Sequence, residues 1–394
     1  MTLANGRAYL AIPGPSVMPD SVIRAMMRAS PNIYKGELHD LVASLLPDLK
    51  MVARTDGHVA IYVGNGHAAW EASLANTLSR GDKVLLARVG HFGTAWGEMA
   101  AQMGVEVEIL EAAAGQPVCP EALQARLARD EAGEIKAILV VHVDTSSGLK
   151  SDIAALRAAI DAAGHGALLM VDCIASLGCD DFRMDAWGVD VMLAACQKGL
   201  MTPAGISFVW FNDKARDRRG DLVTGYWDWR PRSSPELFYQ HFAGTAPTHH
   251  LYGLRAALDL IATEGLDAVH ARHAHLARAI WAAFDAWEAE GDLRLSVRDR
   301  SARSHAVTCA RMPDPQAEHL RGWCETTCGL TLGIGLAQQP PGAHFRIGHM
   351  GHVNAHMILG CLSTIEAGLT ALGIPHGAGA LDAAARVIAE ARPA

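Results

Sequence analysis

A lysine stands where the chain otherwise predicts the interior of a sheet. Lys198 follows the apolar run "VDVMLAAC" and precedes a second apolar run, "GISFVWF". An unpaired ammonium is costly to bury, so a lysine at this position needs a polar partner or a chemical use. A neutral lysine amine forms Schiff bases with aldehydes, and burial lowers the pKa of the amine toward that reactive form.

An aspartate at the end of an upstream apolar run suggests what that use is. Asp172 closes the stretch "ALLMVD". In enzymes that use pyridoxal phosphate, a lysine binds the cofactor aldehyde and a carboxylate pairs with the protonated pyridine nitrogen. That pairing keeps the ring protonated, so the ring can withdraw electrons from a bound substrate. Lys198 and Asp172 are therefore the predicted catalytic pair.

The stretch "GNGHAAWE" is a candidate phosphate-binding turn. Gly64 and Gly66 let the backbone approach an anion, and free N–H groups at the start of a following helix point toward it. The same residues also fit a dinucleotide fingerprint, Gly64-x-Gly66-x-x-Ala69, with Asp82 downstream. That alternative leaves Lys198 unexplained, and the segment is not the first element of a mononucleotide-binding unit. We therefore prefer the phosphate turn.

The elements that must position these residues alternate along the chain. Short apolar runs rich in β-branched residues are separated by longer amphipathic runs. This alternation predicts a mainly parallel sheet that is covered by helices on both faces. Strands are expected at residues 58–64, 83–90, 105–110, 135–144, 167–172 and 189–195. Ligands of such sheets bind at the carboxyl ends of the strands, where Asn65, Asp172 and Lys198 all lie.

The pattern changes after residue 247. A long helical region over residues 251–287 is interrupted at Glu264-Gly265, and short strands and helices follow. We expect a large α/β domain over residues 1–265 and a smaller C-terminal α+β domain over residues 266–394. The first 20 residues or so are expected to pack near the small domain or a dimer partner.

Composition limits the possible classes of protein. The chain has 394 residues, of which 50% are apolar and 19% charged, as in folded globular proteins. A net charge of -8 without a basic stripe argues against a nucleic-acid partner. The apolar runs are too short to span a membrane, and Pro13 breaks the only candidate signal-peptide core. Eight scattered cysteines favour reduced thiols, so we expect a cytoplasmic protein.

Three histidines in "GHMGHVNAH" raise the question of a metal. His349, His352 and His356 would share a face if the whole stretch were helical. Gly348 and Gly351 instead predict a strand and a turn before the helix begins. We therefore expect no metal site.

Taken together, the sequence resembles the class V, fold-type I aminotransferases that depend on pyridoxal phosphate, in the serine–glyoxylate and alanine–glyoxylate branch. The resemblance covers nearly the whole chain. It rests on "IPGPSVMPDSVIRAMM", "RGDKVLLAR", "EIKAILVVHVDTSSG", "AIDAAGHGALLMVD", "WGVDVMLAACQKGLMTPAG", "LYGLRAAL" and "FRIGHMG". It implies the fold-type I architecture, pyridoxal 5'-phosphate as cofactor, and a homodimer with shared active sites.

The resemblance also implies residue roles. Lys198 would carry the Schiff base, and Asp172 would face the pyridine nitrogen. The other implied contacts are Asn65, Gly66, His67 and Gln197 at the phosphate, Phe92 on the ring face, Ser146 near the ring oxygen, Thr245 at the phosphate of the neighbouring subunit, and Arg346 at the substrate carboxylate.

The chain departs from the branch on the substrate side of the site. Tyr34-Lys35 replaces a His-Arg pair, and Gly244 replaces a tyrosine. In the phosphate turn, "GNGH" is similar to the alanine–glyoxylate form and differs from the Ser-Gly-Thr-Gly of serine–glyoxylate enzymes. The substrate-side departures make Tyr34 and Lys35 candidate substrate-binding residues and leave the amino donor open.

The predicted function is transfer of an amino group from a small amino acid, serine first and alanine next, to glyoxylate or pyruvate. Alternatives are a transaminase of the same fold with another donor, such as aspartate or pyridoxamine, and a pyridoxal-phosphate-dependent lyase. A lyase would need no 2-oxo acid acceptor. A cofactor-binding protein without turnover is a further alternative, disfavoured because the chain carries no DNA-binding extension.

Overall fold

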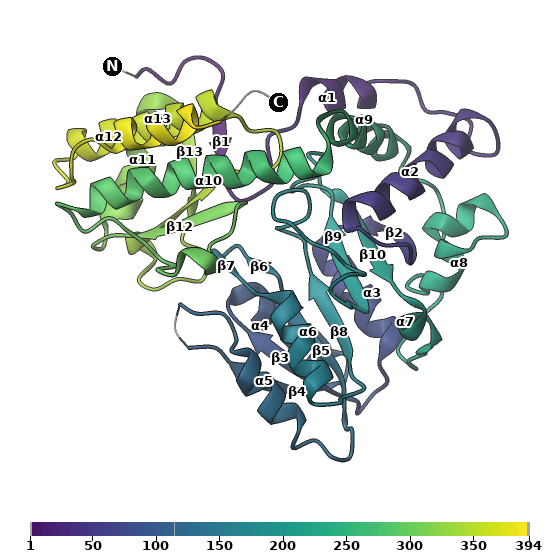
Figure 1. Cartoon of the computed structure of the whole chain (residues 1–394). Coiled ribbons are helices and arrows are strands. Elements are labelled where there is room, and N and C mark those ends of the chain that lie inside the picture. The colour runs from purple at the N-terminus through teal and green to yellow at the C-terminus, as the bar shows by residue number, and fades with distance from the viewer. Residues whose placement is uncertain (1, 114, 392–394) are drawn as a thin grey trace.

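Two sheets organise the chain in the computed structural model, which describes residues 2–113 and 115–391. A seven-stranded sheet forms the centre of a large α/β unit, and a five-stranded sheet forms the centre of a smaller α+β unit. Figure 1 shows the two units side by side, with the C-terminal helices on the smaller one. Within the described residues, no helix is long and apolar enough to cross a membrane.

The large sheet is mainly parallel, as predicted. Its spatial order is β2 (His58–Gly64), β10 (Gly205–Phe211), β9 (Val191–Ala195), β8 (Leu168–Asp172), β5 (Ile135–Val141), β3 (Lys83–Arg88) and β4 (Glu106–Glu111). The strands from β9 to β4 pair in parallel. Only β10 is reversed, because it pairs antiparallel with both β9 and β2.

Helices cover both faces of this sheet, which explains the continuous apolar runs of its strands. In β8, Leu169 and Val171 join one hydrophobic cluster, whereas Leu168 and Met170 join the cluster on the opposite face. The first face carries α1 (Asp20–Met26), α2 (Glu37–Ala53), α5 (Pro120–Leu127), α6 (Ile153–Ala162) and α9 (Thr248–Glu264). The second carries α3 (Gly66–Thr77), α4 (His91–Gln102), α7 (Asp213–Asp217) and α8 (Trp229–Ser233).

The smaller unit has its own hydrophobic core. Its sheet has the order β1 (Tyr9–Ala11), β13 (Leu330–Ile334), β14 (His344–Gly348), β12 (Val307–Arg311) and β11 (Arg294–Leu295). The helices around it are α10 (Leu266–Glu288), α11 (Gln316–Cys328), α12 (Ala355–Ala371) and α13 (Ala380–Ala389). Phe345 and Ile347 from the sheet pack with Phe284 and Ile358 from these helices. Short 3-10 turns lie at Phe238–Phe242, Arg300–Ala302 and Pro341–Ala343.

The N-terminal strand belongs to the sheet of the smaller unit. Tyr9 and Ala11 of β1 pair in parallel with Leu330 and Leu332 of β13, and Figure 1 shows this strand beside the C-terminal helices. The chain then crosses to the large unit, where α1 packs against α9. A single glycine, Gly265, separates α9 from α10. A domain boundary at this glycine stays a prediction.

The two units meet over the carboxyl ends of the large-sheet strands. Val307 and Cys309 of β12 pack against Val143, which lies beyond β5, and Ala175, which lies beyond β8. Val143 belongs to a small hairpin of β6 (Val143–Asp144) and β7 (Leu149–Lys150). This junction encloses the polar residues that follow the strands.

Candidate active site

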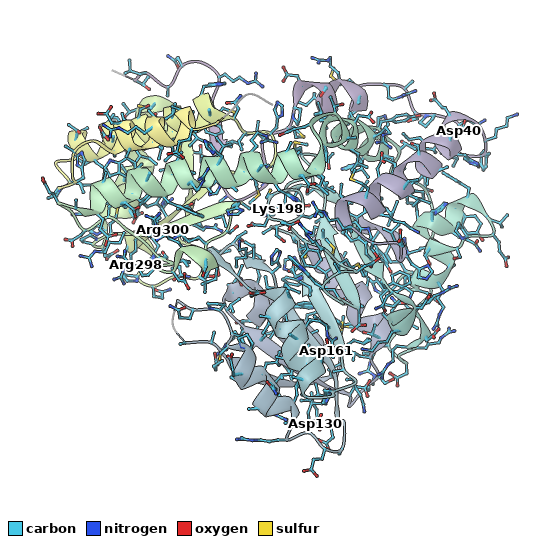
Figure 2. The ribbon with its side chains drawn as sticks, viewed as in Figure 1. Asp40, Asp130, Asp161, Lys198, Arg298 and Arg300 are labelled. Atoms are coloured by element: carbon cyan, nitrogen blue, oxygen red, sulfur yellow. The ribbon has the colours of Figure 1, made fainter. Side chains whose placement is uncertain are left out.

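A cavity of about 180 Å³ lies at the carboxyl ends of β2, β8 and β9. It is lined by Asn65, Gly66, His67, Trp70, Phe92, Val143, Thr145, Asp172, Ile174, Ala175, Gln197 and Lys198. Figure 2 shows Lys198 where the two units meet. Segments that follow five strands of the large sheet, β2, β3, β5, β8 and β9, therefore converge on one small space.

Lys198 is held in a turn directly after β9. Its Nζ donates a hydrogen bond of 2.5 Å to the carbonyl oxygen of Pro13. The Ser16 hydroxyl donates to the Lys198 carbonyl oxygen at 2.6 Å, so the N-terminal segment holds both ends of the residue. Burial, and secondly the charge of Arg346, lowers the pKa of Lys198 to about 8. The amine is therefore neutral far more often than in an ordinary lysine, as a nucleophile requires.

Asp172 is a buried carboxyl group, only 3% exposed, at the end of β8. Its Oδ2 accepts a hydrogen bond of 2.8 Å from Trp70 Nε1, and its Oδ1 accepts one of 2.7 Å from the Ile174 backbone N–H. Burial raises the pKa of Asp172 to about 7, although both hydrogen bonds act in the opposite direction. A positively charged ring nitrogen would stabilise this carboxylate, so the site fits a protonated pyridine.

The turn between β2 and α3 is built to approach a ligand. The Asn65 side chain caps α3 by accepting a hydrogen bond from the His67 backbone N–H at 3.1 Å. A Cβ added at Gly66 would lie 2.4 Å from Ile174 Cδ1, so a side chain there would displace the Ile174 side chain that lines the cavity. Across the cavity, the buried Oε1 of Gln197 has no hydrogen-bond partner in the described chain. The helix N-terminus presents backbone N–H donors that fit a phosphate group, and the Gln197 side chain can add a donor when its amide NH₂ group faces the cavity.

Phe92 provides an aromatic wall. It is the second residue of α4, and its ring meets that of Trp70 edge-on at 6.3 Å between centroids. An aromatic face, a buried carboxyl group, a lysine amine of lowered pKa and an anion-binding turn are the groups that bind pyridoxal phosphate. The residues present therefore fit the predicted cofactor.

Ser146 does not line the cavity, contrary to the expected contact with the ring oxygen. Its hydroxyl donates to Asp144 Oδ1 at 2.6 Å and accepts from the His91 backbone N–H at 3.0 Å. The neighbouring Thr145 lines the cavity instead. The Ser146 hydroxyl is instead engaged with Asp144 and with the first residue of α4.

Arg346 lies beside the cavity, on β14 of the smaller sheet, and is 8% exposed. Its Nε donates to the Ile334 carbonyl oxygen at 2.6 Å, and its Nη1 donates to the Thr145 carbonyl oxygen at 3.0 Å. Burial lowers the pKa of Arg346 from its ordinary value. Its role at a substrate carboxylate stays a prediction.

Besides Ser146 and Arg346, three further predicted site residues lie outside the cavity of their own chain. Tyr34 is 84% exposed, and Lys35 beside it is also exposed, in the loop before α2. Thr245 is exposed in the loop before α9. None of the three lines the cavity around Lys198.

The structure adds residues that the pattern of the sequence did not single out. Trp70 lies three positions after His67, so helical spacing alone could have placed both on one face. Pro13 and Ser16 contact Lys198 although they lie near the N-terminus of the chain. No local sequence pattern predicts that contact. The site therefore includes a segment that only the fold brings to it.

Comparisons with known proteins agree with this arrangement. The class-V aminotransferase family model matches residues 61–337. The chain is 38% identical to the serine–glyoxylate aminotransferase of Methylorubrum extorquens over 95% of this chain and 94% of the relative. It is 35% identical to the L-aspartate–glyoxylate aminotransferase of Paracoccus denitrificans over 95% and 94% of the two chains. The structure of pyridoxamine–pyruvate aminotransferase from Mesorhizobium loti matches it with a TM-score of 0.89 and 25% identity, over 99% and 100% of the chains.

Proposed function

The chain belongs to the class-V aminotransferase family and is a transaminase that depends on pyridoxal phosphate, and from this premise we propose that it moves the amino group of L-serine to glyoxylate. One observation carries the proposal: the same cavity is lined by a lysine of lowered pKa and by a buried aspartate. Serine and glyoxylate are the substrates named for the relative at 38% identity. Alanine as donor and pyruvate as acceptor are the next choices.

Each residue of the site contributes one step. When bound, the cofactor supplies an aldehyde that exchanges with the substrate amine and a ring that withdraws electrons. Lys198 Nζ takes the proton from the α-carbon of the donor and later returns a proton to the cofactor side. Asp172 stabilises the positive ring nitrogen throughout. Arg346 holds the substrate carboxylate, so that the α-hydrogen faces the lysine amine.

The absorption spectrum of the purified protein tests this function. The protein loaded with pyridoxal phosphate is expected to be yellow, and L-serine without an acceptor is expected to bleach the band as the amino group moves to the cofactor. Adding glyoxylate afterwards should restore the band and produce glycine. L-alanine, L-aspartate and pyridoxamine are compared in parallel at equal concentration.

The results of this experiment distinguish an error in the proposed amino donor from an error in the proposed cofactor chemistry. A band that serine leaves unchanged but aspartate or pyridoxamine bleaches would move the donor to that compound, as in the relatives named for those substrates. A protein that binds no pyridoxal phosphate would contradict the proposed function as a whole.

The pH dependence of cofactor incorporation follows from the lysine. Burial lowers the pKa of Lys198 to about 8, and only the neutral amine attacks an aldehyde. The rate at which cofactor-free protein becomes yellow should rise about tenfold per pH unit below pH 7 and level off above about pH 8. Stopped-flow absorbance from about pH 6 to pH 10 measures it. A rate that climbs with the same slope to pH 10, as an ordinary lysine requires, would contradict the lowered pKa.

We propose that the enzyme is a homodimer with shared active sites. The large unit exposes the side chains of Tyr34, Tyr226, Leu237 and Tyr239, which we call the apolar surface. Tyr226 donates a hydrogen bond to the Val63 carbonyl oxygen at the end of β2, and Phe238, between Leu237 and Tyr239, stacks on His39 of α2 at 3.8 Å between centroids. Burial of this surface between two copies would stabilise a dimer.

The three predicted site residues outside the cavity fit that arrangement. Tyr34 is part of the apolar surface, Lys35 is next to it, and Thr245 follows the 3-10 turn that carries Tyr239. In a symmetric dimer, surface residues beside one cavity can reach the cavity of the partner subunit. Thr245 would then bond the phosphate across the interface, while Tyr34 and Lys35 would face the substrate.

Replacing Tyr239 with glutamate should weaken the dimer at least about tenfold, because the interface would bury an unpaired charge. Sedimentation equilibrium measures the change, and activity should fall in parallel with dissociation. The matched control is Ile109→Glu on β4, at the far edge of the large sheet, where the side chain is 43% exposed against 54% for Tyr239. Equal dimer stability in the two variants would contradict an interface at the apolar surface.

We also propose that the enzyme works in the cytoplasm. All eight cysteines are free thiols, and most of them are buried in the hydrophobic cores. Reduced, buried thiols are typical of proteins from reducing compartments.

A further inference from the structure

Asp144 is a fully buried carboxylate next to the active site that the chemistry above does not use. Its Oδ2 accepts hydrogen bonds from the backbone N–H groups of Phe92 at 2.9 Å and Gly93 at 3.3 Å. Its Oδ1 accepts from the backbone N–H of Ser146 at 2.9 Å and from the Ser146 hydroxyl at 2.6 Å. The N-terminus of α4 thus stabilises the buried charge, while the charge satisfies the first turn of that helix.

The surroundings of Asp144 leave space for this carboxylate and little else. A Cβ added at Gly90, which precedes α4, would lie 2.4 Å from the Asp144 carboxyl carbon. The Ser146 hydroxyl completes the arrangement by accepting from the His91 backbone N–H at 3.0 Å. The first three backbone N–H groups of α4 therefore all donate to Asp144 or to the Ser146 hydroxyl that is bonded to it.

Two groups of the active site depend on this arrangement. Phe92, whose backbone is bonded to Asp144, lines the cavity with its ring. On the other side, Thr145 follows Asp144 directly, lines the same cavity, and accepts a hydrogen bond from Arg346 Nη1 through its carbonyl oxygen. One carboxylate therefore connects the aromatic wall with the arginine.

We propose that Asp144 is a positioning residue that sets the Phe92 ring and the Arg346 guanidinium in their places relative to each other. The proposal rests on the proposed function, because it assigns Phe92 to the cofactor and Arg346 to the substrate. Without the carboxylate, α4 loses its N-terminal acceptor and Thr145 loses its fixed backbone. Cofactor contact and substrate binding then weaken together.

The variant Asp144→Asn tests the proposal. Asparagine has nearly the same shape, but its NH₂ group would face N–H donors in place of one carboxylate oxygen. The dissociation constant of pyridoxal phosphate, measured by quenching of tryptophan fluorescence, should rise about tenfold. The visible circular dichroism of the bound cofactor should change, since Phe92 faces its ring. The KM for L-serine should rise by a larger factor than kcat falls.

A matched control distinguishes positioning from general stability. Asp190 is 3% exposed and accepts hydrogen bonds from the Leu169 N–H at 2.8 Å and from Asn212 at 2.9 Å. It immediately precedes β9 and so lies at the amino edge of the same sheet, opposite the cavity. Asp190→Asn should destabilise the fold while leaving the cofactor dissociation constant and the visible circular dichroism as in the parent.

A folded Asp144→Asn protein with the parent's cofactor dissociation constant, circular dichroism and KM would overturn the proposal. If that variant does not fold, Ser146→Ala decides, because it removes one donor and keeps the carboxylate. It should shift the same three quantities in the same direction by about two- to threefold, and parent values would overturn the proposal. A parent protein without cofactor binding would overturn the proposed function and this inference together.

Discussion

Replacing Lys198 with alanine removes transamination, and kcat/KM for L-serine should fall at least about 10⁴-fold. The variant loses both the amine that binds the cofactor aldehyde and the base that moves the α-proton. Among the residues that the structure describes, no other lysine lines the cavity, and no second lysine amine is therefore placed to replace it. Steady-state kinetics measures the loss, and the absorption spectrum of the loaded variant should resemble that of the free aldehyde.

Two comparisons make the Lys198 result specific. Lys83→Ala changes a surface lysine on β3 that pairs with Glu134 at 2.6 Å, and it should leave kcat/KM unchanged. Far-ultraviolet circular dichroism of Lys198→Ala should match the parent, because the change is confined to one side chain at a turn. A variant that keeps more than about one-hundredth of the parent kcat/KM would contradict the assignment.

Replacing Asp172 with asparagine has the second largest expected effect, a fall of about 10²–10³-fold in kcat/KM. Asparagine keeps the size of the side chain but carries no charge to stabilise the positive ring nitrogen. It can still accept a hydrogen bond from Trp70 or from the Ile174 N–H, the two groups that bond Asp172. The loss should therefore appear mainly in kcat, since the ring must withdraw electrons only during the reaction.

Asp172→Asn lowers kcat/KM, but it should raise the stability of the cofactor-free protein above neutral pH. Burial raises the pKa of Asp172 to about 7, so the folded state holds a proton that the unfolded chain releases near pH 4. The parent without cofactor therefore loses stability as the pH rises from about 4 to about 7, where the buried carboxyl must ionise. At pH 8, cofactor-free Asp172→Asn should unfold at a higher urea concentration than the parent. A less stable variant at that pH would contradict the raised pKa.

Several residues of the site could be predicted from the local sequence pattern. Lys198 and Asp172 close apolar runs that form adjacent parallel strands, and such strands bring their carboxyl ends to one edge. Asn65, Gly66 and His67 follow a third run that begins and ends as predicted at residues 58 and 64. For these positions the local pattern of apolar and polar residues was sufficient. Residues that directly follow parallel strands lie together at one edge of the sheet, so finding the strands also locates the residues.

Other positions could not be derived from that pattern. Ser146 and Thr145 are neighbours with similar hydroxyls, and only the conformation of the turn decides which one lines the cavity. The contact between Pro13 and Lys198 joins the bend that follows β1 of the smaller sheet to a turn of the larger one. Neither feature leaves a local signal, because each depends on how separate segments pack.

Strand periodicity, turn residues and the buried lysine thus predict the sheet, the cofactor chemistry and the catalytic pair from the order of residues alone, and the sheet is confirmed. The packing of the two units adds the rest: the N-terminal strand in the smaller sheet, the carbonyl that holds the lysine amine, and the carboxylate of Asp144 beneath Phe92. The division has a physical cause. Period and polarity act over a few residues, whereas desolvation and hydrogen bonding inside the site arise only where distant segments exclude water together.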